Sequence, residues 1–148
     1  MLHVTLIACG KLKESYLRDA AAEYAKRLKT YMNLEVKELA DGPDPGAEAL
    51  RIRQSIPENA YIITLEISGI ELSSEEFADN LDRLMTGGVS HICFIIGGSD
   101  GLDDSITARA DMHLSFSRMT FPHQLMRVIF LEQLYRAFRI IRKEPYHK

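Results

Sequence analysis

Short apolar runs rich in β-branched residues alternate along this chain with segments of helical periodicity. The runs "LHVTLIAC" (2–9), "YIITLEI" (61–67), "HICFII" (91–96) and "MHLSFS" (112–117) are bounded by polar or glycine residues, which predicts strands. A fifth run, "LEVKEL" (34–39), alternates strictly and predicts an edge strand with one solvated face. This alternation predicts an α/β fold, with an open, mostly parallel sheet and helices on both faces. We expect the strands from residue 61 onward to be central.

Three helices are predicted between and after these runs. In residues 15–29 the apolar side chains recur at spacings of three and four and form one stripe. Ser73 and Glu76 have the spacing of a capping box, which predicts a helix start, and "TGG" (86–88) ends that helix. The last helix is expected to begin near Pro122, whose missing N–H costs nothing in a first turn, and to reach about Arg142. The stretch "ADGPDPG" (40–46) predicts a flexible surface loop.

Length and composition indicate one cytoplasmic domain. The 148 residues fit a single domain, residues 1–148. No apolar stretch approaches the ~18 residues of a membrane span, and the N-terminus lacks the features of a signal peptide. Cys9 and Cys93 each lie inside an apolar run with no C-x-x-C pair, so we expect buried thiols and no metal site.

The charge of the chain is unevenly distributed. The net charge is −3, but residues 1–31 hold six basic and three acidic side chains, and residues 118–148 hold seven basic and two acidic ones. If the fold brings the two ends together, they form a basic face that suits a polyanion. Ordinary variation of surface charge explains the same pattern equally well.

Three turns that follow predicted strands indicate a binding site. They are "GGSDG" (97–101), "EISG" (66–69) and "SFSRMTFP" (115–122). In an open α/β sheet, ligands bind beyond the carboxyl ends of central strands, and glycines there let backbone approach a ligand closely. The chain has neither G-x-G-x-x-G nor a P-loop sequence, so "GGSDG" is either a ligand-binding turn or a simple strand-to-helix corner.

The last predicted helix is apolar around more of its circumference than a surface helix needs, which favours a symmetric dimer. Beyond Pro145 the chain ends in Tyr146, His147 and Lys148. Terminal residues are usually frayed, so their chemistry alone does not assign them a role.

The segments "TLEISG", "FIIGGSDGL" and "LSFSRMTFPHQLMRVIFLEQLYRAFRIIRKEPYHK" together closely resemble the bacterial ribosomal RNA large subunit methyltransferase H family, which is of the SPOUT class. The resemblance extends over essentially the whole chain. It implies a SPOUT-type α/β fold with a C-terminal deep trefoil knot, and a homodimer. It also implies that S-adenosylmethionine is the cofactor and that N3 of a pseudouridine in 23S ribosomal RNA is methylated, on the assembled ribosome.

The resemblance also implies which residues bind the cofactor. They come from the three turns: Leu65, Gly69, Gly97, Gly98, Gly101, Phe116, Ser117, Arg118, Met119, Thr120 and Phe121. A cationic sulfonium needs no phosphate cradle, which accounts for the missing phosphate motifs. Glu66 and Asp100 either favour the positive cofactor or are ordinary solvated carboxylates.

The resemblance places the C-terminal tail "RKEPYHK" (142–148) at the active site, reaching it from the partner subunit. Catalysis is therefore assigned to this tail. We hypothesise that His147 or Tyr146 accepts or relays the N3 proton, and that Arg142 stabilises charge on the base carbonyls. A role in positioning the RNA alone is the competing hypothesis for these residues. RNA contact is expected from the two basic ends: Lys11, Lys13, Arg18, Arg127, Arg136, Arg139 and Lys143.

Two alternatives come from other classes of protein. A non-enzymatic RNA-binding or ribosome-assembly module explains the basic ends without the tail. A small nucleotide- or flavin-binding protein of flavodoxin-like topology explains the glycine turns, although only one glycine follows the first predicted strand.

Overall fold

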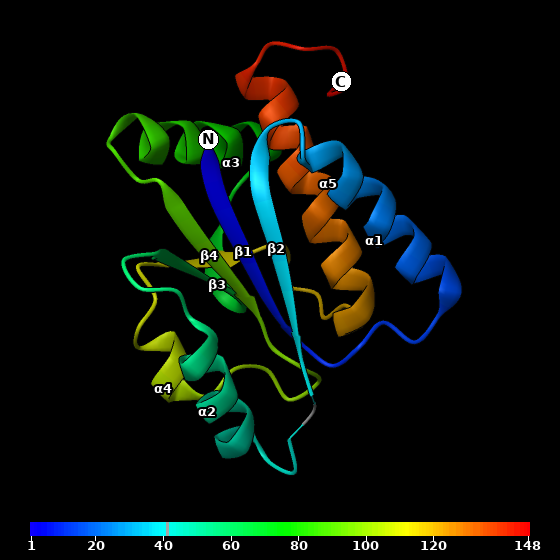
Figure 1. Ribbon diagram of the computed structural model, residues 1–148, viewed down its shortest axis with the longest axis vertical. Helices are drawn as coiled ribbons and strands as arrows, with labels where there is room; N and C mark the ends of the chain where they lie inside the picture. The colour runs from blue at the N-terminus through cyan, green and yellow to red at the C-terminus, as the bar shows by residue number, and fades with distance from the viewer. Residues whose placement is uncertain (41) are drawn as a thin grey trace.

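The computed structural model describes residues 1–40 and 42–148 and contains one five-stranded sheet (Figure 1). The strand order is β2-β1-β4-β3-β5, and every pair is parallel. The strands are β1 (Leu2–Cys9), β2 (Met32–Leu39), β3 (Tyr61–Glu71), β4 (His91–Ile96) and β5 (Met112–Ser115). The open, parallel α/β sheet that the sequence predicts is therefore confirmed.

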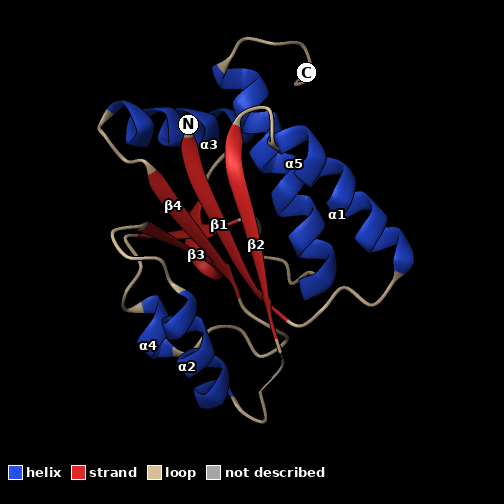
Figure 2. Cartoon of the chain, viewed as in Figure 1, coloured by secondary structure: helices blue, strands red, loops and turns tan. Residues whose placement is uncertain are grey.

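Helices cover both faces of the sheet, as expected (Figure 2). One face packs against α1, α3 and α5, and the other against α2 and α4. The helices are α1 (Ser15–Leu28), α2 (Pro45–Ser55), α3 (Ser74–Thr86), α4 (Asp104–Thr107) and α5 (His123–Ile141). Among the described residues, no helix is long and apolar enough to cross a membrane.

The central strands bury side chains on both faces, which explains their nearly continuous apolar sequences. Along β4, Ile92, Phe94 and Ile96 face the larger core beneath α1, α3 and α5. The alternate residues Cys93 and Ile95 face the smaller core beneath α2 and α4. Both cysteine side chains are buried, as predicted, and burial raises the pKa of the Cys93 thiol to about 12.

The two edge strands test the predicted order. β2 lies at one edge, so the expectation of an edge strand is confirmed. After Met32 its side chains are half-buried or exposed, and the alternation is broken at Glu35 and Val36, which are both exposed. The expectation that every strand from residue 61 onward is central was wrong for β5, which forms the other edge. β1 lies between β2 and β4 instead, because parallel strands joined by helices need not follow chain order.

The predicted loop at 40–46 is partly wrong. Residue 41 lies outside the described residues, but α2 already begins at Pro45. The carboxylate of Asp44 accepts a hydrogen bond of 2.8 Å from the backbone N–H of Ala47 and caps the helix. An N-cap aspartate followed by proline is a helix-start signal that the cluster of glycine and proline obscured.

The other helix termini agree with the sequence. Ser73 and Glu76 form both hydrogen bonds of a capping box at the start of α3. α5 begins directly after Pro122 and ends before Arg142. Lys143 then adopts a left-handed φ of 56°. The N–H groups of Lys143 and Glu144 donate to the carbonyl oxygens of Ile140 and Arg139, which is a Schellman motif.

Candidate cofactor site

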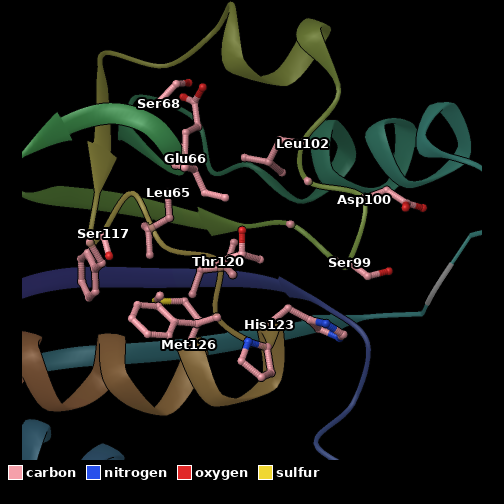
Figure 3. Close-up of a pocket in the computed structure, with 18 of the residues that line it drawn as sticks. Leu65, Glu66, Ser68, Ser99, Asp100, Leu102, Ser117, Thr120, His123 and Met126 are labelled. Atoms are coloured by element: carbon pink, nitrogen blue, oxygen red, sulfur yellow. The ribbon is translucent and has the colours of Figure 1, made fainter.

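The carboxyl ends of β3, β4 and β5 surround a cavity of about 720 Å³. Because all three strands are parallel, the segments that follow them meet at one edge of the sheet. Figure 3 shows the residues around the cavity, with Leu65 and Glu66 from β3, Ser99 and Asp100 after β4, and Ser117 after β5. The cavity has the size of a small-molecule binding site, which is typically ~300–1,000 Å³.

The turn after β4 forms one wall of the cavity. The N–H of Gly101 donates a hydrogen bond of 3.0 Å to the carbonyl oxygen of Gly98, and Gly101 has a φ of 77°. A Cβ atom on Gly97 would lie 2.6 Å from the carbonyl oxygen of Gly101. The sequence "GGSDG" is therefore both a tight corner and a cavity wall, and ligand binding by this turn stays a prediction.

Residues 65–68 of β3 form the second wall, where the pairing of β3 with β5 shifts register between Leu65 and Ile70. Glu66 lies on this wall with 19% of its side chain exposed. Its Oε2 atom accepts a hydrogen bond of 2.6 Å from the Thr64 hydroxyl and pairs with Nδ1 of His113 on β5. The carboxylate is thus held in place by two neighbouring side chains.

The segment after β5 forms the third wall and is organised by Ser117. Its hydroxyl accepts a hydrogen bond of 2.9 Å from the N–H of Met119, and its carbonyl oxygen accepts one of 3.1 Å from the Ser115 hydroxyl. These contacts hold the chain in a turn that leaves Met119 74% exposed at the cavity. Phe116 and Phe121 also line the cavity. This wall offers an apolar, aromatic surface to a ligand.

The first turn of α5 closes the cavity with Pro122, His123 and Met126, which sequence reasoning did not assign to the site. The sequence predicted a helix start at Pro122, directly after the segment assigned to the cofactor. Residues one turn apart share a face of a helix, so the spacing of Pro122 and Met126 could have assigned Met126 to the site. The loop after β1 lies beside this helix terminus, because the N–H of Lys13 donates a hydrogen bond of 3.0 Å to Gln124 Oε1.

All but two of the predicted cofactor residues line the cavity: Leu65, Gly97, Gly98, Gly101, Phe116, Ser117, Met119, Thr120 and Phe121. The two exceptions are Gly69 and Arg118. A Cβ atom on Gly69 would lie 2.8 Å from the backbone of His113, so this glycine permits the close packing of β3 on β5. The Arg118 side chain is 86% exposed and lies 3.4 Å from Glu71, outside the cavity.

The charge of the lining indicates what kind of ligand fits. Among the described residues that line the cavity, Glu66 and Asp100 are acidic and none is lysine or arginine. An anionic phosphate finds no lysine or arginine here, whereas a cationic group finds two carboxylates. The apolar third wall suits an aromatic base. This lining fits S-adenosylmethionine, which combines adenosine with a positively charged sulfur. No group of histidine, cysteine or acidic residues in the described part of the chain is arranged to hold a metal ion.

The predicted catalytic residues lie at the other end of α5. This helix has 19 residues and is about 28 Å long at ~1.5 Å per residue. Its first turn lines the cavity, whereas Arg142, Tyr146 and His147 follow its last turn. In Figure 1 the C-terminus lies at the end of the molecule opposite the carboxyl ends of the strands. A single chain therefore does not bring its tail to its own cavity.

The predicted RNA-binding residues divide into a group beside the loop after β1, a group near the tail, and Arg127 alone. Lys11, Lys13 and Arg18 are exposed on and beside the loop after β1. Near the tail, Lys143 is exposed, while Arg136 and Arg139 are half-buried and paired with other side chains: Glu132 and His147 for Arg136, Tyr31 and Glu144 for Arg139.

Arg127 corrects the prediction of an RNA-contacting face. Only 2% of this residue is exposed. Its guanidinium pairs with Glu38 and donates a hydrogen bond of 2.8 Å to the carbonyl oxygen of Gly10. The side chain is committed to the protein interior, so it does not belong to the exposed basic surface.

The fold and the cavity define an α/β protein with a cavity of small-molecule size at the carboxyl edge of a parallel sheet. A family model described as "Predicted SPOUT methyltransferase" matches residues 2–147. The chain therefore belongs to the SPOUT methyltransferase family.

Curated relatives support this assignment over the whole chain. The protein named ribosomal RNA large subunit methyltransferase H of Bacillus pumilus is 49% identical over 159 aligned positions, which cover 99% of this chain and 100% of that protein. The proteins of the same name from Clostridium acetobutylicum and Bifidobacterium adolescentis are 50% and 51% identical, with the same coverage. The resemblance stated from the sequence motifs is confirmed.

Solved structures share the fold at low sequence identity. The tRNA (m1G37) methyltransferase from Aquifex aeolicus aligns with a TM-score of 0.57 and 12% identity, covering 99% of this chain and 74% of that one. A probable methylase family protein from Haemophilus influenzae aligns with a TM-score of 0.54 and 14% identity, covering 99% of this chain and 70% of that one.

Proposed function

We propose that this enzyme transfers a methyl group from S-adenosylmethionine to N3 of a pseudouridine in 23S ribosomal RNA, on the assembled ribosome in the cytoplasm. The main supporting observation is the cavity, whose described lining includes two acidic side chains but no lysine or arginine. It belongs to a chain that is about half identical, from end to end, to proteins named ribosomal RNA large subunit methyltransferase H. The family match favours methyl transfer over the flavin-binding and non-enzymatic alternatives.

The cavity walls have distinct roles in this proposal. The apolar third wall, with Phe116, Met119 and Phe121, holds the adenine. The backbone of the turn at residues 97–101 bonds the polar edges of the nucleoside, and Glu66 and Asp100 favour the positive charge. When bound, S-adenosylmethionine supplies a methyl group on a positively charged sulfur. The trefoil knot implied by the family resemblance is also part of this proposal.

N3 of the pseudouridine carries a proton that must be removed for methylation, and this proposal assigns its removal to the tail. Burial and the adjacent Glu132 carboxylate raise the pKa of Tyr146, so this phenol stays protonated at neutral pH and is a hydrogen-bond donor. This favours His147 over Tyr146 as the residue that accepts the N3 proton. The exposed Arg142 is suited to stabilise negative charge on the base carbonyls.

We infer a homodimer in which the tail of one subunit completes the cavity of the other. Support comes from the separation of tail and cavity along α5, which a partner subunit related by two-fold symmetry can bridge. Exposed apolar side chains at the start of α5 and beside it, Met119, Phe121 and Leu125, suit burial against a second copy or the substrate.

The RNA surface in this proposal comprises Lys11, Lys13 and Arg18 from one subunit, with Arg142 and Lys143 from the tail of the other. Lys13 lies close to the cavity, since its backbone contacts Gln124 one residue beyond His123. Contacts from lysine and arginine to phosphates predict binding that weakens steeply with salt. A domain this small has little room for base readout, so the assembled ribosome is expected to supply much of the recognition.

Transfer of labelled methyl from S-adenosylmethionine tests the function. The substrates are ribosomes that lack the modification and, in parallel, free ribosomal RNA. We expect label on a pseudouridine of the large-subunit RNA, and far more of it with assembled ribosomes. Absence of label on both substrates, with measurable cofactor binding, would exclude the proposed substrate.

A further inference from the structure

The C-terminal tail folds back onto its own α5. The Schellman motif at Lys143 reverses the chain, and Arg139 donates a hydrogen bond of 2.8 Å to the carbonyl oxygen of Pro145. The next residue, Tyr146, packs its ring against the ring of Tyr135, with centroids 4.8 Å apart. The last turns of α5 thus form a platform on which the tail lies.

Two charged side chains of α5 hold Tyr146 in place. Glu132 Oε2 accepts hydrogen bonds of 2.7 Å from the Tyr146 hydroxyl and from Arg136, one helical turn away. The guanidinium of Arg136 also lies over the Tyr146 ring, 4.8 Å from its centroid. Arg136 was predicted to contact RNA, but its contacts are with the tail of its own chain.

His147 lies between a donor and an acceptor. Its Nδ1 atom is 3.0 Å from Nη1 of Arg136, and its Nε2 atom is 2.6 Å from Oε1 of Glu75 on α3. A guanidinium only donates hydrogen bonds, and an ionised carboxylate only accepts them. These neighbours are satisfied by the neutral imidazole with its proton on Nε2. An imidazolium, or the other tautomer, would direct an N–H at the N–H of Arg136.

The pair of Glu75 and His147 has the arrangement of a base and its orienting carboxylate. In such pairs the carboxylate holds one N–H of the imidazole, and the other nitrogen accepts a proton from the substrate. Here Nδ1 is the acceptor nitrogen, and an N–H of Arg136 donates to it. A substrate N–H can take the place of that guanidinium N–H.

We propose that Glu75 and Arg136 are positioning residues that hold His147 as the Nε2–H tautomer, with Nδ1 as the nitrogen that accepts the N3 proton. In the step itself the N3–H bond breaks and an Nδ1–H bond forms, and the resulting imidazolium is stabilised by Glu75. The two electrons of the N3–H bond stay on N3. This inference rests on the proposed function for its reaction, but the tautomer itself is a property of the protein alone.

The matched variants are Glu75→Ala, Glu75→Gln and Asp79→Ala. The amide oxygen of glutamine can still accept the Nε2–H bond, so Glu75→Gln is the rescue variant. Asp79 lies on the same helix and pairs with Arg83 on the surface, so Asp79→Ala controls for losing a carboxylate from α3. Histidine labelled with ¹⁵N gives the tautomer from the two ring-nitrogen shifts, and methyl transfer to ribosomes gives kcat and KM.

We expect the Nε2–H tautomer at His147 in the unmodified protein, in Glu75→Gln and in Asp79→Ala. Glu75→Ala should give a mixture of tautomers and a kcat lowered on the order of tenfold to a hundredfold, with an unchanged KM for S-adenosylmethionine. The Nδ1–H tautomer in the unmodified protein would overturn the proposal, and so would Glu75→Ala with unchanged spectra and kcat. If the unmodified protein transfers no methyl group, the proposed function fails, while the spectra still decide the positioning.

Discussion

Arg127 on α5 donates a hydrogen bond of 2.8 Å to the carbonyl oxygen of Gly10, which directly follows β1. The same guanidinium pairs with Glu38 on β2. With 2% of Arg127 exposed, this contact joins the start of the last helix to the ends of two strands inside the protein. This contact fixes the position of the first turn of α5, which lines the cavity, relative to the sheet.

Replacing Arg127 by methionine is therefore expected to destabilise the protein. The variant leaves the buried Gly10 carbonyl oxygen without its donor and leaves Glu38, whose side chain is 36% exposed, without its charged partner. Losing one partner of a buried hydrogen bond typically costs ~1–3 kcal/mol. Equilibrium unfolding in urea measures the change. Arg83→Met is the matched control, because Arg83 pairs with Asp79 at 2.8 Å while its side chain is 79% exposed. That variant is expected to change the free energy of unfolding by about 0.5 kcal/mol or less. Equal, small effects for both variants would contradict the structural role of Arg127.

The fold was predictable from the sequence where the signal is local. The central strands follow from continuous β-branched runs, and the start of α3 follows from Ser73 and Glu76. Arg127 was misassigned because its partner Glu38 is 89 residues away, and no local pattern identifies such a pair. The position of β5 at an edge was missed for the same reason, since strand order is a tertiary property.

The candidate site was predictable to the extent that glycine turns at strand ends identify it. Gly97, Gly98 and Gly101 line the cavity as expected. Gly69 does not, because a glycine needed for close strand packing and one needed for ligand approach look alike in sequence. The contacts of Arg136 with the tail were not foreseen, because the reversal of the chain depends on the left-handed backbone of Lys143.

The turn at residues 97–101 predicts a contrast between two neighbouring glycines. Gly97→Ala places a Cβ atom 2.6 Å from the carbonyl oxygen of Gly101, so the turn must shift. On Gly98 the nearest atom is 3.6 Å away, which is ordinary contact. We expect Gly97→Ala to weaken S-adenosylmethionine binding on the order of tenfold or more and to cost ~1–3 kcal/mol of stability. Gly98→Ala should cost less than ~1 kcal/mol. Calorimetric titration and urea unfolding measure both, and the reverse order would show that the turn is not closely packed.

Lys143 occupies a left-handed position with a φ of 56°, which is strained for a residue with a Cβ atom. Lys143→Gly is expected to stabilise the protein by ~1 kcal/mol. Lys29 ends α1 with a right-handed φ of −60°, so Lys29→Gly is expected to destabilise by a few tenths to ~1 kcal/mol. The melting temperature and the free energy of unfolding in urea should therefore rise for Lys143→Gly and fall for Lys29→Gly. A loss of stability in both would contradict the assignment of the Schellman motif.

His91 predicts a dependence of stability on pH. Burial lowers the pKa of His91 in the folded protein, and the nearby positive charges of His3 and Lys37 lower it further. The unfolded state thus takes up a proton at higher pH than the folded state, so stability falls as the pH decreases through about 6.5. His91→Gln keeps a partner for the Thr5 hydroxyl, which lies 2.8 Å from Nε2 of His91, and should flatten this dependence. Urea unfolding between about pH 7.5 and 5.5 measures it. Identical slopes in both proteins would exclude His91 as the source.

The composite site is tested most directly by mixing two impaired variants. One lacks residues 146–148 but keeps its cavity, and the other carries Gly97→Ala in the cavity but keeps its tail. The truncated variant alone should bind S-adenosylmethionine but transfer no methyl group to ribosomes, and Gly97→Ala alone should transfer little at a cofactor concentration far below its own dissociation constant. When equal amounts of the two variants exchange subunits at random, about half of the dimers are mixed. Each mixed dimer has one complete site, whereas the unmodified dimer has two, so about one quarter of the unmodified activity should return. No recovery in confirmed mixed dimers, or full activity of the truncated variant alone, would contradict a site built from the cavity of one subunit and the tail of the other.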